Sequence, residues 1–429
     1  MSLMAFEGGA GSGKTHSVME ELAGELSREP LKVHQRVLAL TFMHGARHRL
    51  DEKLEGIGSL RGRYDAMTID SFAWTICRRW QSRLRAYGQE LPDLEQDGAF
   101  DTVCGLAARL LEDADVRKWV TASYPYILID EAQDLFGPRL AMVDQLRLDA
   151  CVLLAFDDFQ CLNSRNRPVA VVGWIAERCH PKVLQGCRRT NVTELLQAAT
   201  EIRDGKAIAA SGSSFQVKLA PGGKTGPALP ATLAAYAMMK TGTFALLSPS
   251  RPASSAYVRD IVEMVRTQSL GKAKNVGPFD IRWEGAEEEP IKALRMQLRT
   301  AVRHGFRELV RMLSDAGFAA AAQTAQQLRR LRAGRGQEEF ATSEVEALLD
   351  RQIAVASQFT RRPVGRRRAM TIHQAKNREF DHVVVLWPFQ IPPDDDDRRR
   401  LLYNAVTRAR QSCLVLVQAP PLLEKPPFV

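Results

Sequence analysis

A glycine-rich loop near the start of this 429-residue chain constrains its fold more than any other feature. The loop fits the pattern G-x-x-x-x-G-K-[ST] and consists of Gly8, Gly9, Ala10, Gly11, Ser12, Gly13, Lys14 and Thr15. An apolar stretch at residues 3–6 precedes it, and a helical pattern at residues 14–26 follows it. Between a strand and a helix, such a loop turns backbone N–H groups toward a phosphate, and the helix dipole favours that charge. A glycine-rich turn without function is the alternative, but the placement favours a nucleoside triphosphate site.

Other apolar stretches are typical of buried parallel strands, because they are nearly continuous and end in polar residues. They lie at residues 36–42, 126–130, 151–156, 244–248, 382–387 and 413–417, and further helical patterns lie at residues 256–266 and 399–409. An α/β fold with parallel sheets is therefore expected, with ligands at the carboxyl ends of the strands. Three segments are expected to be loops: the Gly-, Pro- and Ser-rich passage at 209–230, the basic run at 361–368 and the four aspartates at 394–397.

Polar residues follow these strands where a triphosphate would lie. Lys14 is expected to bridge the β- and γ-phosphates, and the Thr15 hydroxyl and the Asp130 carboxylate are expected to hold Mg²⁺. Glu131 is placed to accept the proton of an attacking water, and Gln160 can orient that water. An acidic helix start is the alternative for the carboxylate pair. Together these residues predict an ATP hydrolase that uses Mg²⁺.

Several longer motifs, in order along the chain, resemble those of the UvrD/Rep/PcrA-like helicases of superfamily 1. The matching segments are residues 40–46, 67–73, 183–190, 370–380 and 400–409. The resemblance implies that Arg188 lends a positive charge to the nucleotide and that Glu379 holds the ribose. It also implies that Arg408 is the arginine finger that stabilises charge on the γ-phosphate. An arginine on a helix surface is the alternative for Arg408.

The resemblance further implies two RecA-like parallel-sheet motor domains with small helical insertions. The first would comprise residues 1–185, with a reduced helical insert at about 75–122. The second would comprise residues 186–283 and 366–429, interrupted by a helical insert at 284–365. If Arg188 and Arg408 come from the second domain, ATP would hold the domains together and hydrolysis would let them part, as a motor requires.

By resemblance, the expected function is an ATP-driven translocase or helicase on single-stranded or partly duplex DNA, moving 3′ to 5′. The reduced inserts favour a compact motor that works with a protein partner, for instance a nuclease in DNA repair or anti-phage defence. The alternative is an ATPase switch that responds to nucleic acid or a partner without processive unwinding. A third class, a P-loop kinase, would have no use for the last two motifs.

Candidate nucleic-acid contacts lie in or directly next to the motifs and are Thr41, Phe42, Thr68, Phe72, Trp74 and His373. Packing in the core is the alternative for the three aromatic residues. In the family, aromatic residues that stack on bases follow the glutamine of the third motif, whereas no aromatic residue follows Gln160 closely here. Stacking contributes about 1–3 kcal/mol per base, so a weaker grip on the strand, or a grip from elsewhere, is expected. Only seven residues precede Gly8, which leaves the base specificity of the nucleotide site open.

Composition narrows the class of protein further. The net charge of +9 suits a polyanionic partner, because each neutralised phosphate releases counterions. The sequence has no apolar run of about 18 residues, as a membrane-spanning helix requires. Its N-terminus has neither the basic nor the apolar region of a secretory signal. The seven cysteines form no C-x-x-C pair and are expected to be buried, inert thiols of a cytoplasmic protein.

Overall fold

The computed structural model describes residues 2–42, 44–93, 98–222, 228–272, 275–284, 288–359 and 366–429. The chain forms two compact units. Unit 1 comprises Met1–Leu219 and Ile372–Val429, and unit 2 comprises Ala220–Thr371. The C-terminal segment therefore returns to the same compact unit as the glycine-rich loop. The basic run at 361–368, expected to be a loop, lies outside the described residues as far as position 365. Its last two residues, Arg367 and Arg368, belong to a strand instead, β11 (Arg367–Thr371).

Unit 1 alternates strands and helices along most of its length. Its first part contains β1 (Leu3–Gly8), α1 (Lys14–Arg28), β2 (Val37–Thr41), α2 (His44–Glu55), β3 (Tyr64–Thr68), α3 (Ile69–Arg79), α4 (Gln81–Ala86), α5 (Ala99–Glu112), α6 (Ala114–Ser123) and β4 (Tyr126–Ile129). The chain continues with η1 (Ala132–Asp134), α7 (Gly137–Leu146), β5 (Cys151–Phe156), η2 (Asp158–Gln160), α8 (Ala170–Ala176), β6 (Lys182–Leu184), α9 (Thr193–Asp204) and β7 (Phe215–Leu219). It ends with β12 (Phe380–Trp387), α16 (Asp395–Val406), β13 (Ala409–Val417) and α17 (Pro420–Leu423).

The first sheet of unit 1 has six strands in the order β3-β2-β4-β5-β1-β6. Neighbouring strands are parallel, and their register aligns Thr41 with Thr68 and Glu7 with Phe156. The carboxyl ends of β1, β2, β4 and β5 therefore meet at one edge, where the glycine-rich loop begins. This arrangement confirms the predicted α/β fold and places the polar residues that follow the strands close together.

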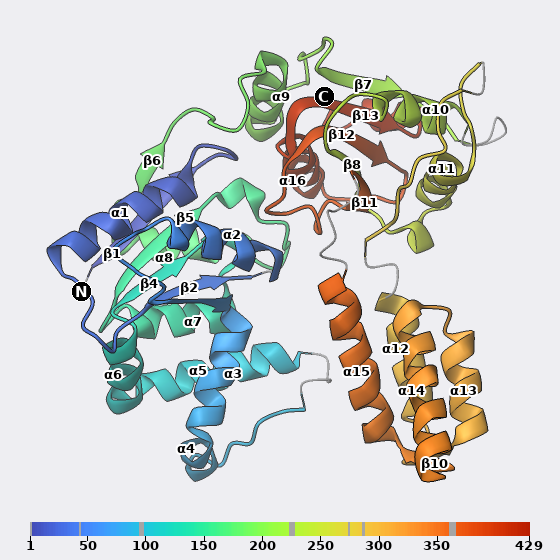
Figure 1. Ribbon diagram of the computed structural model, residues 1–429. Helices are drawn as coiled ribbons and strands as arrows, with labels where there is room; N and C mark the ends of the chain where they lie inside the picture. The colour runs from blue at the N-terminus through green and yellow to red at the C-terminus, as the bar shows by residue number, and fades with distance from the viewer. Residues whose placement is uncertain are drawn as a thin grey trace. The chain divides into compact units, whose positions relative to one another are not determined.

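Two apolar layers cover the faces of this sheet, because successive strand residues point to opposite sides. Along β5, Leu153 and Ala155 pack with the apolar residues of α1 and α2, whereas Leu154 and Phe156 pack with those of α3, α5, α7 and α8. Helix α1 contributes Val18 and Leu22 among other residues to the first layer. The sheet is thus the middle of a three-layer sandwich whose helices lie on both faces (Figure 1).

A second group of parallel strands in unit 1 consists of β7, β13 and β12, with Cys413 opposite both Phe215 and Val383. Strand β7 lies inside the passage at 209–230, where a loop was expected. That expectation was wrong, because Phe215 is fully buried and β7 adds hydrogen bonds along the edge of β13. Glycine and serine before this five-residue strand, and proline and glycine after it, conceal it in the sequence.

Helix α16 begins earlier than its sequence pattern suggests. The aspartates at 394–397, expected to form a loop, instead cap and start this helix, and the side chain of Asp394 accepts a hydrogen bond from the Asp397 amide at 2.9 Å. Negative charge in a first helical turn is favourable, because it faces the positive end of the helix dipole. The helix also ends at Val406, before Arg408, instead of continuing to residue 409.

Unit 2 contains a short parallel pair of strands and a helical segment. Its elements are α10 (Ala228–Ala237), β8 (Phe244–Ser248), η3 (Pro252–Ser254), α11 (Ala256–Thr267), α12 (Glu288–Leu298), β9 (Arg303–Gly305), α13 (Phe306–Asp315), α14 (Ala319–Arg335), β10 (Glu339–Ala341), α15 (Thr342–Phe359) and β11 (Arg367–Thr371). Strands β8 and β11 pair in parallel, and β9 and β10 pair in antiparallel. Helices α12 to α15 share a small apolar core that includes Leu298, Leu313 and Leu328.

Two expectations from composition concern helices and cysteines. Among the helices that the structure describes, none combines the length and the apolar character needed to cross a lipid bilayer. Five cysteines are buried, as expected, whereas Cys179 and Cys187 are partly exposed. Burial raises the pKa of the Cys77 and Cys104 thiols to about 12, so both are protonated and unreactive at neutral pH.

Candidate nucleotide-binding site

The glycine-rich loop, called the phosphate loop below, joins the buried strand β1 to helix α1. Gly11 and Gly13 have positive φ angles of 77° and 90°, which side chains with a Cβ rarely adopt. Space is also limited, since a Cβ on Gly13 would lie 3.1 Å from Cδ of Arg188. Both glycines are therefore required, and the loop presents its backbone at the N-terminus of α1, where an anion is favoured.

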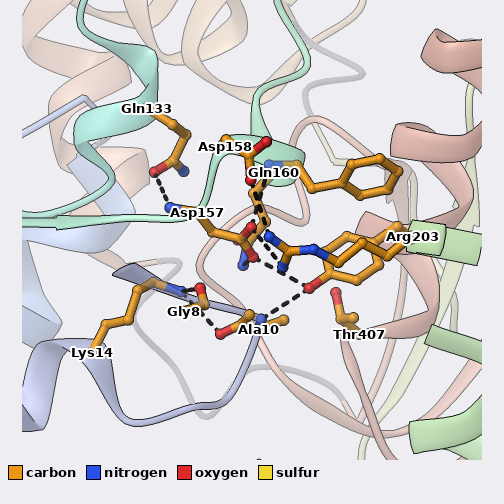
Figure 2. A network of polar contacts seen from close by, with 12 residues as sticks. Gly8, Ala10, Lys14, Gln133, Asp157, Asp158, Gln160, Arg203 and Thr407 are labelled. Atoms are coloured by element: carbon orange, nitrogen blue, oxygen red, sulfur yellow. Dashed lines mark hydrogen bonds and ion pairs between the residues drawn. The ribbon is translucent and has the colours of Figure 1, made fainter. Parts of the chain in front are cut away.

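Lys14 and Thr15 extend from the first turn of α1 toward the end of the sheet. The Lys14 ammonium donates hydrogen bonds to the carbonyl oxygens of Gly8 at 2.8 Å and Gly9 at 3.0 Å (Figure 2). The Thr15 hydroxyl lies 3.4 Å from both carboxylate oxygens of Asp130. The structure therefore brings the expected phosphate ligand and the expected pair of metal ligands to one place.

Asp130 and Glu131 follow β4 and have opposite pKa shifts. Burial raises the pKa of Asp130 to about 6, and the adjacent Glu131 acts in the same direction. Burial alone would also raise the pKa of Glu131, but the positive charges of Lys376, Lys14 and Arg408 outweigh it and lower that pKa. Glu131 is thus ionised at neutral pH and able to accept a proton.

The backbone at Glu131 is strained, with φ at 61° in the left-handed region. Neighbouring side chains hold it there. The Gln133 amide donates to the Glu131 carboxylate, and the Lys376 ammonium donates to both oxygens of Asp134 at 2.9 and 2.8 Å. The loop after β4 is therefore fixed by Gln133 and, through Asp134, by Lys376 far along the chain.

Gln160 ends the turn that follows β5, and its side chain is oriented by Asp157. Its amide nitrogen donates to Asp157 Oδ2 at 2.8 Å, and its amide oxygen lies 3.4 Å from Nη2 of Arg408. Arg408 itself is 1% exposed and lies behind Gln160. The positive charge of Arg408 interacts with the Glu131 carboxylate and is one of the charges that lower its pKa.

The segment after β6 lies on the phosphate loop. The Arg188 amide donates to the Gly11 carbonyl at 2.6 Å, and the Arg188 side chain runs past Gly13. The next residue, Arg189, donates to Glu379 at 2.9 Å, and Arg410 donates to the other Glu379 oxygen. Burial opposes ionisation of Glu379, but Arg189 and Arg410 outweigh it and lower its pKa to about 2.

These segments enclose a cavity of about 260 Å³. Its lining comes from widely separated parts of unit 1 and comprises Gly11, Gly13, Lys14, Thr15, His16, Arg49, Leu50, Lys53, Asp130, Glu131, Gln160, Arg188, Arg189, Asn377 and Glu379. Its cations and glycines suit a polyphosphate, and its carboxylates can receive a metal ion and a proton. The size and chemistry of the cavity fit a nucleoside triphosphate better than a neutral ligand.

Several lining residues were missed in the sequence. Arg49 and Lys53 are spaced i, i+4 on α2, so both point to the same side of that helix. This spacing was the available signal. Arg189 lies in the motif at 183–190, where its neighbour Arg188 carried the expected role. Arg203, described below, had no signal of its own, and Tyr403 lies within the motif at 400–409 but was not expected to have a role of its own.

The candidate nucleic-acid residues have mixed positions. Thr41 and Phe72 are 0% and 3% exposed, and the Thr68 hydroxyl caps α3 by accepting from the Ser71 amide. These three side chains are buried in this structure, and the expectation that they contact a nucleic-acid strand stays a prediction. Phe42 and Trp74 are partly buried against the same core, and His373 is exposed.

Comparisons with known proteins match both ends of the chain. A UvrD-like helicase C-terminal domain matches residues 367–416, and an AAA domain matches residues 1–165. A search of curated protein sequences found no significant match.

Two solved structures are similar to the chain at low identity. One is the complex of Arterivirus nonstructural protein 10 (helicase) with DNA, with 10% identity and a TM-score of 0.39, covering 99% of this chain and 63% of that one. The other is Arterivirus nonstructural protein 10 (helicase), with 11% identity and a TM-score of 0.40, covering 99% and 61%. The chain thus spans less than two thirds of the length of these proteins.

The two family matches contain most of the residues that build the cavity. The match at the N-terminal end includes the phosphate loop, Asp130 and Gln160, and the match at the C-terminal end includes Glu379 and Arg408. Residues from both matched segments therefore meet at one site in unit 1. The matches thus relate residues 367–416 to the C-terminal domain of UvrD-like helicases and residues 1–165 to an AAA domain.

Proposed function

We propose that this chain is an ATP-driven motor that translocates along single-stranded DNA or unwinds partly duplex DNA. One observation carries the proposal: a single cavity is lined by the phosphate loop, a carboxylate pair, Gln160, the arginines Arg188 and Arg189 of one later motif and Glu379 of another. A phosphate-binding turn alone would serve many enzymes. Residues supplied from distant segments allow hydrolysis to change the contacts between those segments, which a motor needs.

In this proposal each residue has a chemical role at the triphosphate. Lys14 moves from the carbonyl oxygens that it now contacts to the oxygens of the β- and γ-phosphates. The backbone amides of the phosphate loop donate hydrogen bonds to these phosphate oxygens as well. Gln160 positions the attacking water, and Glu131 takes its proton. Arg188 and Arg408 supply positive charge as negative charge develops on the γ-phosphate.

The donor set fits Mg²⁺. The Thr15 hydroxyl and the Asp130 carboxylate lie side by side, and both offer the oxygen ligands that this ion prefers. When bound, the ion would neutralise phosphate charge. The raised pKa of Asp130 reflects a buried carboxylate whose charge a cation would offset.

We propose further that the motor consists of a RecA-like domain at residues 1–185 and a second one at residues 186–283 and 366–429, with a helical insert at 284–365. The direction of travel is 3′ to 5′, by the family resemblance. The compact inserts favour work with a protein partner such as a nuclease, in DNA repair or anti-phage defence, in the cytoplasm.

The test is the rate of ATP hydrolysis as a function of the length of a single-stranded DNA oligonucleotide. A translocase spends longer on a longer strand between binding and dissociation, so the rate should keep rising beyond the length of the binding footprint. Lys14→Ala, assayed in parallel, controls for a contaminating ATPase and should be inactive. A wild-type rate that no DNA changes would contradict the proposal.

A second function, an ATPase switch that binds nucleic acid without travelling, is favoured by a specific observation. Phe72 is buried in the core, and no aromatic residue follows Gln160 closely, so base stacking at these positions is missing. In this case the ATPase rate should saturate once the oligonucleotide fills the footprint. A strand-displacement assay on a duplex with a single-stranded tail should then show no product.

A further inference from the structure

Asp157, which follows β5, is the centre of a buried network of hydrogen bonds and has 0% of its surface exposed (Figure 2). Its Oδ1 accepts from Nη1 of Arg203 at 3.1 Å and from the Phe159 amide at 3.2 Å. Its own amide donates to Oε1 of Gln133 at 3.1 Å. The carboxylate is therefore fixed on several sides and has little freedom to rotate.

The second oxygen of Asp157 determines how Gln160 is oriented. Oδ2 accepts from the Gln160 amide nitrogen at 2.8 Å, which leaves the Gln160 oxygen on the side of Arg408. An amide that rotated by half a turn would place an oxygen against a carboxylate oxygen, which is unfavourable. Asp157 thus selects the orientation in which Gln160 offers a hydrogen-bond acceptor.

Tyr403, on α16, joins this carboxylate to the phosphate loop. Its hydroxyl donates to Asp157 Oδ2 at 3.2 Å and accepts from the Ala10 amide at 3.0 Å. Its ring packs edge-on against Phe159, with the ring centroids 5.1 Å apart. Two hydrogen bonds through one hydroxyl therefore link the backbone of the phosphate loop to the residue that orients Gln160.

We propose that Tyr403 is a positioning residue, which transmits the position of the phosphate loop at Ala10 through Asp157 to the amide of Gln160. A displacement of the loop when phosphates enter changes the hydrogen bond that the hydroxyl accepts, and the same hydroxyl holds the oxygen that orients Gln160. The inference rests on the proposed ATP hydrolysis and names a residue that acts on it without touching the nucleotide.

The test is a double-mutant cycle on the full chain with Tyr403→Phe and Gln160→Ala. Tyr403→Phe keeps the ring against Phe159 and removes only the hydroxyl. We expect kcat to fall about tenfold, as for the loss of one hydrogen bond, with less than about a threefold change in KM for ATP. In the Gln160→Ala background, Tyr403→Phe should lower kcat no further, since the residue through which it acts is gone.

Tyr124→Phe is the matched control. Tyr124 also donates its hydroxyl to a carboxylate, Oδ2 of Asp65 at 2.8 Å, but away from the cavity. A loss of stability alone should appear in both variants as a lower thermal midpoint. Only Tyr403→Phe should lower kcat. Effects of Tyr403→Phe and Gln160→Ala that multiply would overturn the proposal, because they would show that Tyr403 acts independently of Gln160.

A second measurement does not depend on turnover. Hydrogen exchange at Asp158–Gln160 should slow when a slowly hydrolysed ATP analogue and Mg²⁺ are added to the wild type. The Tyr403→Phe variant should bind the analogue but show little of this protection. A wild type that binds the analogue without hydrolysing ATP would contradict the proposed function alone, whereas equal protection in both proteins would contradict the role of Tyr403.

Discussion

Arg408 places a positive charge almost entirely inside the protein. Burial lowers the pKa of its guanidinium to about 10, which leaves it charged at neutral pH. Its Nε donates to the Asn404 carbonyl at 3.0 Å, and the carboxylates of Glu131 and Glu379 favour its charge. A buried charge is costly unless it is hydrogen-bonded and compensated. The arginine is therefore fixed in position before any nucleotide binds, as electrostatic stabilisation of a transition state requires.

Arg408→Ala and Lys14→Ala should both reduce turnover but should differ in their effect on nucleotide binding. Both should reduce kcat for ATP by at least about a thousandfold, since each removes positive charge from the reacting phosphate. Lys14→Ala should also weaken nucleotide binding, because Lys14 lines the cavity and Arg408 does not. Steady-state ATPase rates and titration with a fluorescent nucleotide measure the two effects. Arg259→Ala, which removes an exposed arginine of unit 2, is the control and should change neither.

The sequence could place the motif residues of the site because their spacing follows from parallel strands. Lys14, Asp130 and Gln160 each follow a strand closely, and the register of those strands brings them to one edge. The sequence could not reveal that Arg203 and Tyr403 both donate hydrogen bonds to the Asp157 carboxylate. That contact depends on how α9 and α16 pack, and neither residue belongs to a spacing pattern that predicts a partner.

Among the elements, α16 is the one whose limits matter for the site, because it carries Tyr403 and leads to Arg408. Its first turn combines the Asp394 cap with ion pairs from Arg167 to Asp396 and from Asp396 to Arg400. The sequence pattern indicated a helix but not its start, since four consecutive aspartates are equally typical of a solvated loop. The hydrogen bond by which Asp394 caps α16 favours the helix start over the solvated loop.

Asp394→Ala should loosen the start of α16, and Asp394→Asn should not. Loss of an N-cap costs about 1 kcal/mol, whereas asparagine caps nearly as well as aspartate. Hydrogen exchange of the amides in Asp395–Val406 should accelerate about fivefold in the alanine variant. The asparagine variant separates the hydrogen bond from the charge. Equal acceleration in both variants would mean that the charge of Asp394, and not its capping bond, stabilises the helix.

For the whole molecule, the distribution of the chain between two units could not be foreseen from the motifs. Parallel sheets and a helical segment after residue 284 were expected, but motif spacing does not tell where the chain leaves one compact unit and returns to it. The overall charge of the chain, in contrast, follows directly from its composition. The chain has 59 Lys and Arg against 50 Asp and Glu. This excess of positive charge attracts a polyanion over a distance of about one Debye length, beyond which salt screens it.

The excess positive charge leads to a prediction for DNA binding by the whole chain. We assume that the chain neutralises about five phosphates of a single strand. Its affinity for the strand should then fall about a hundredfold between 50 and 200 mM salt, because the release of counterions is less favourable into a more concentrated salt solution. Fluorescence anisotropy with a labelled oligonucleotide of about 20 nucleotides measures this slope. Repeating the titration with the ATP analogue and Mg²⁺ present tests the coupling to the cavity, since a motor must bind DNA differently in its two nucleotide states. An affinity for DNA that varies neither with salt nor with nucleotide would contradict the prediction. The chain would then have an ATPase site but no charged surface that binds DNA in a nucleotide-dependent way.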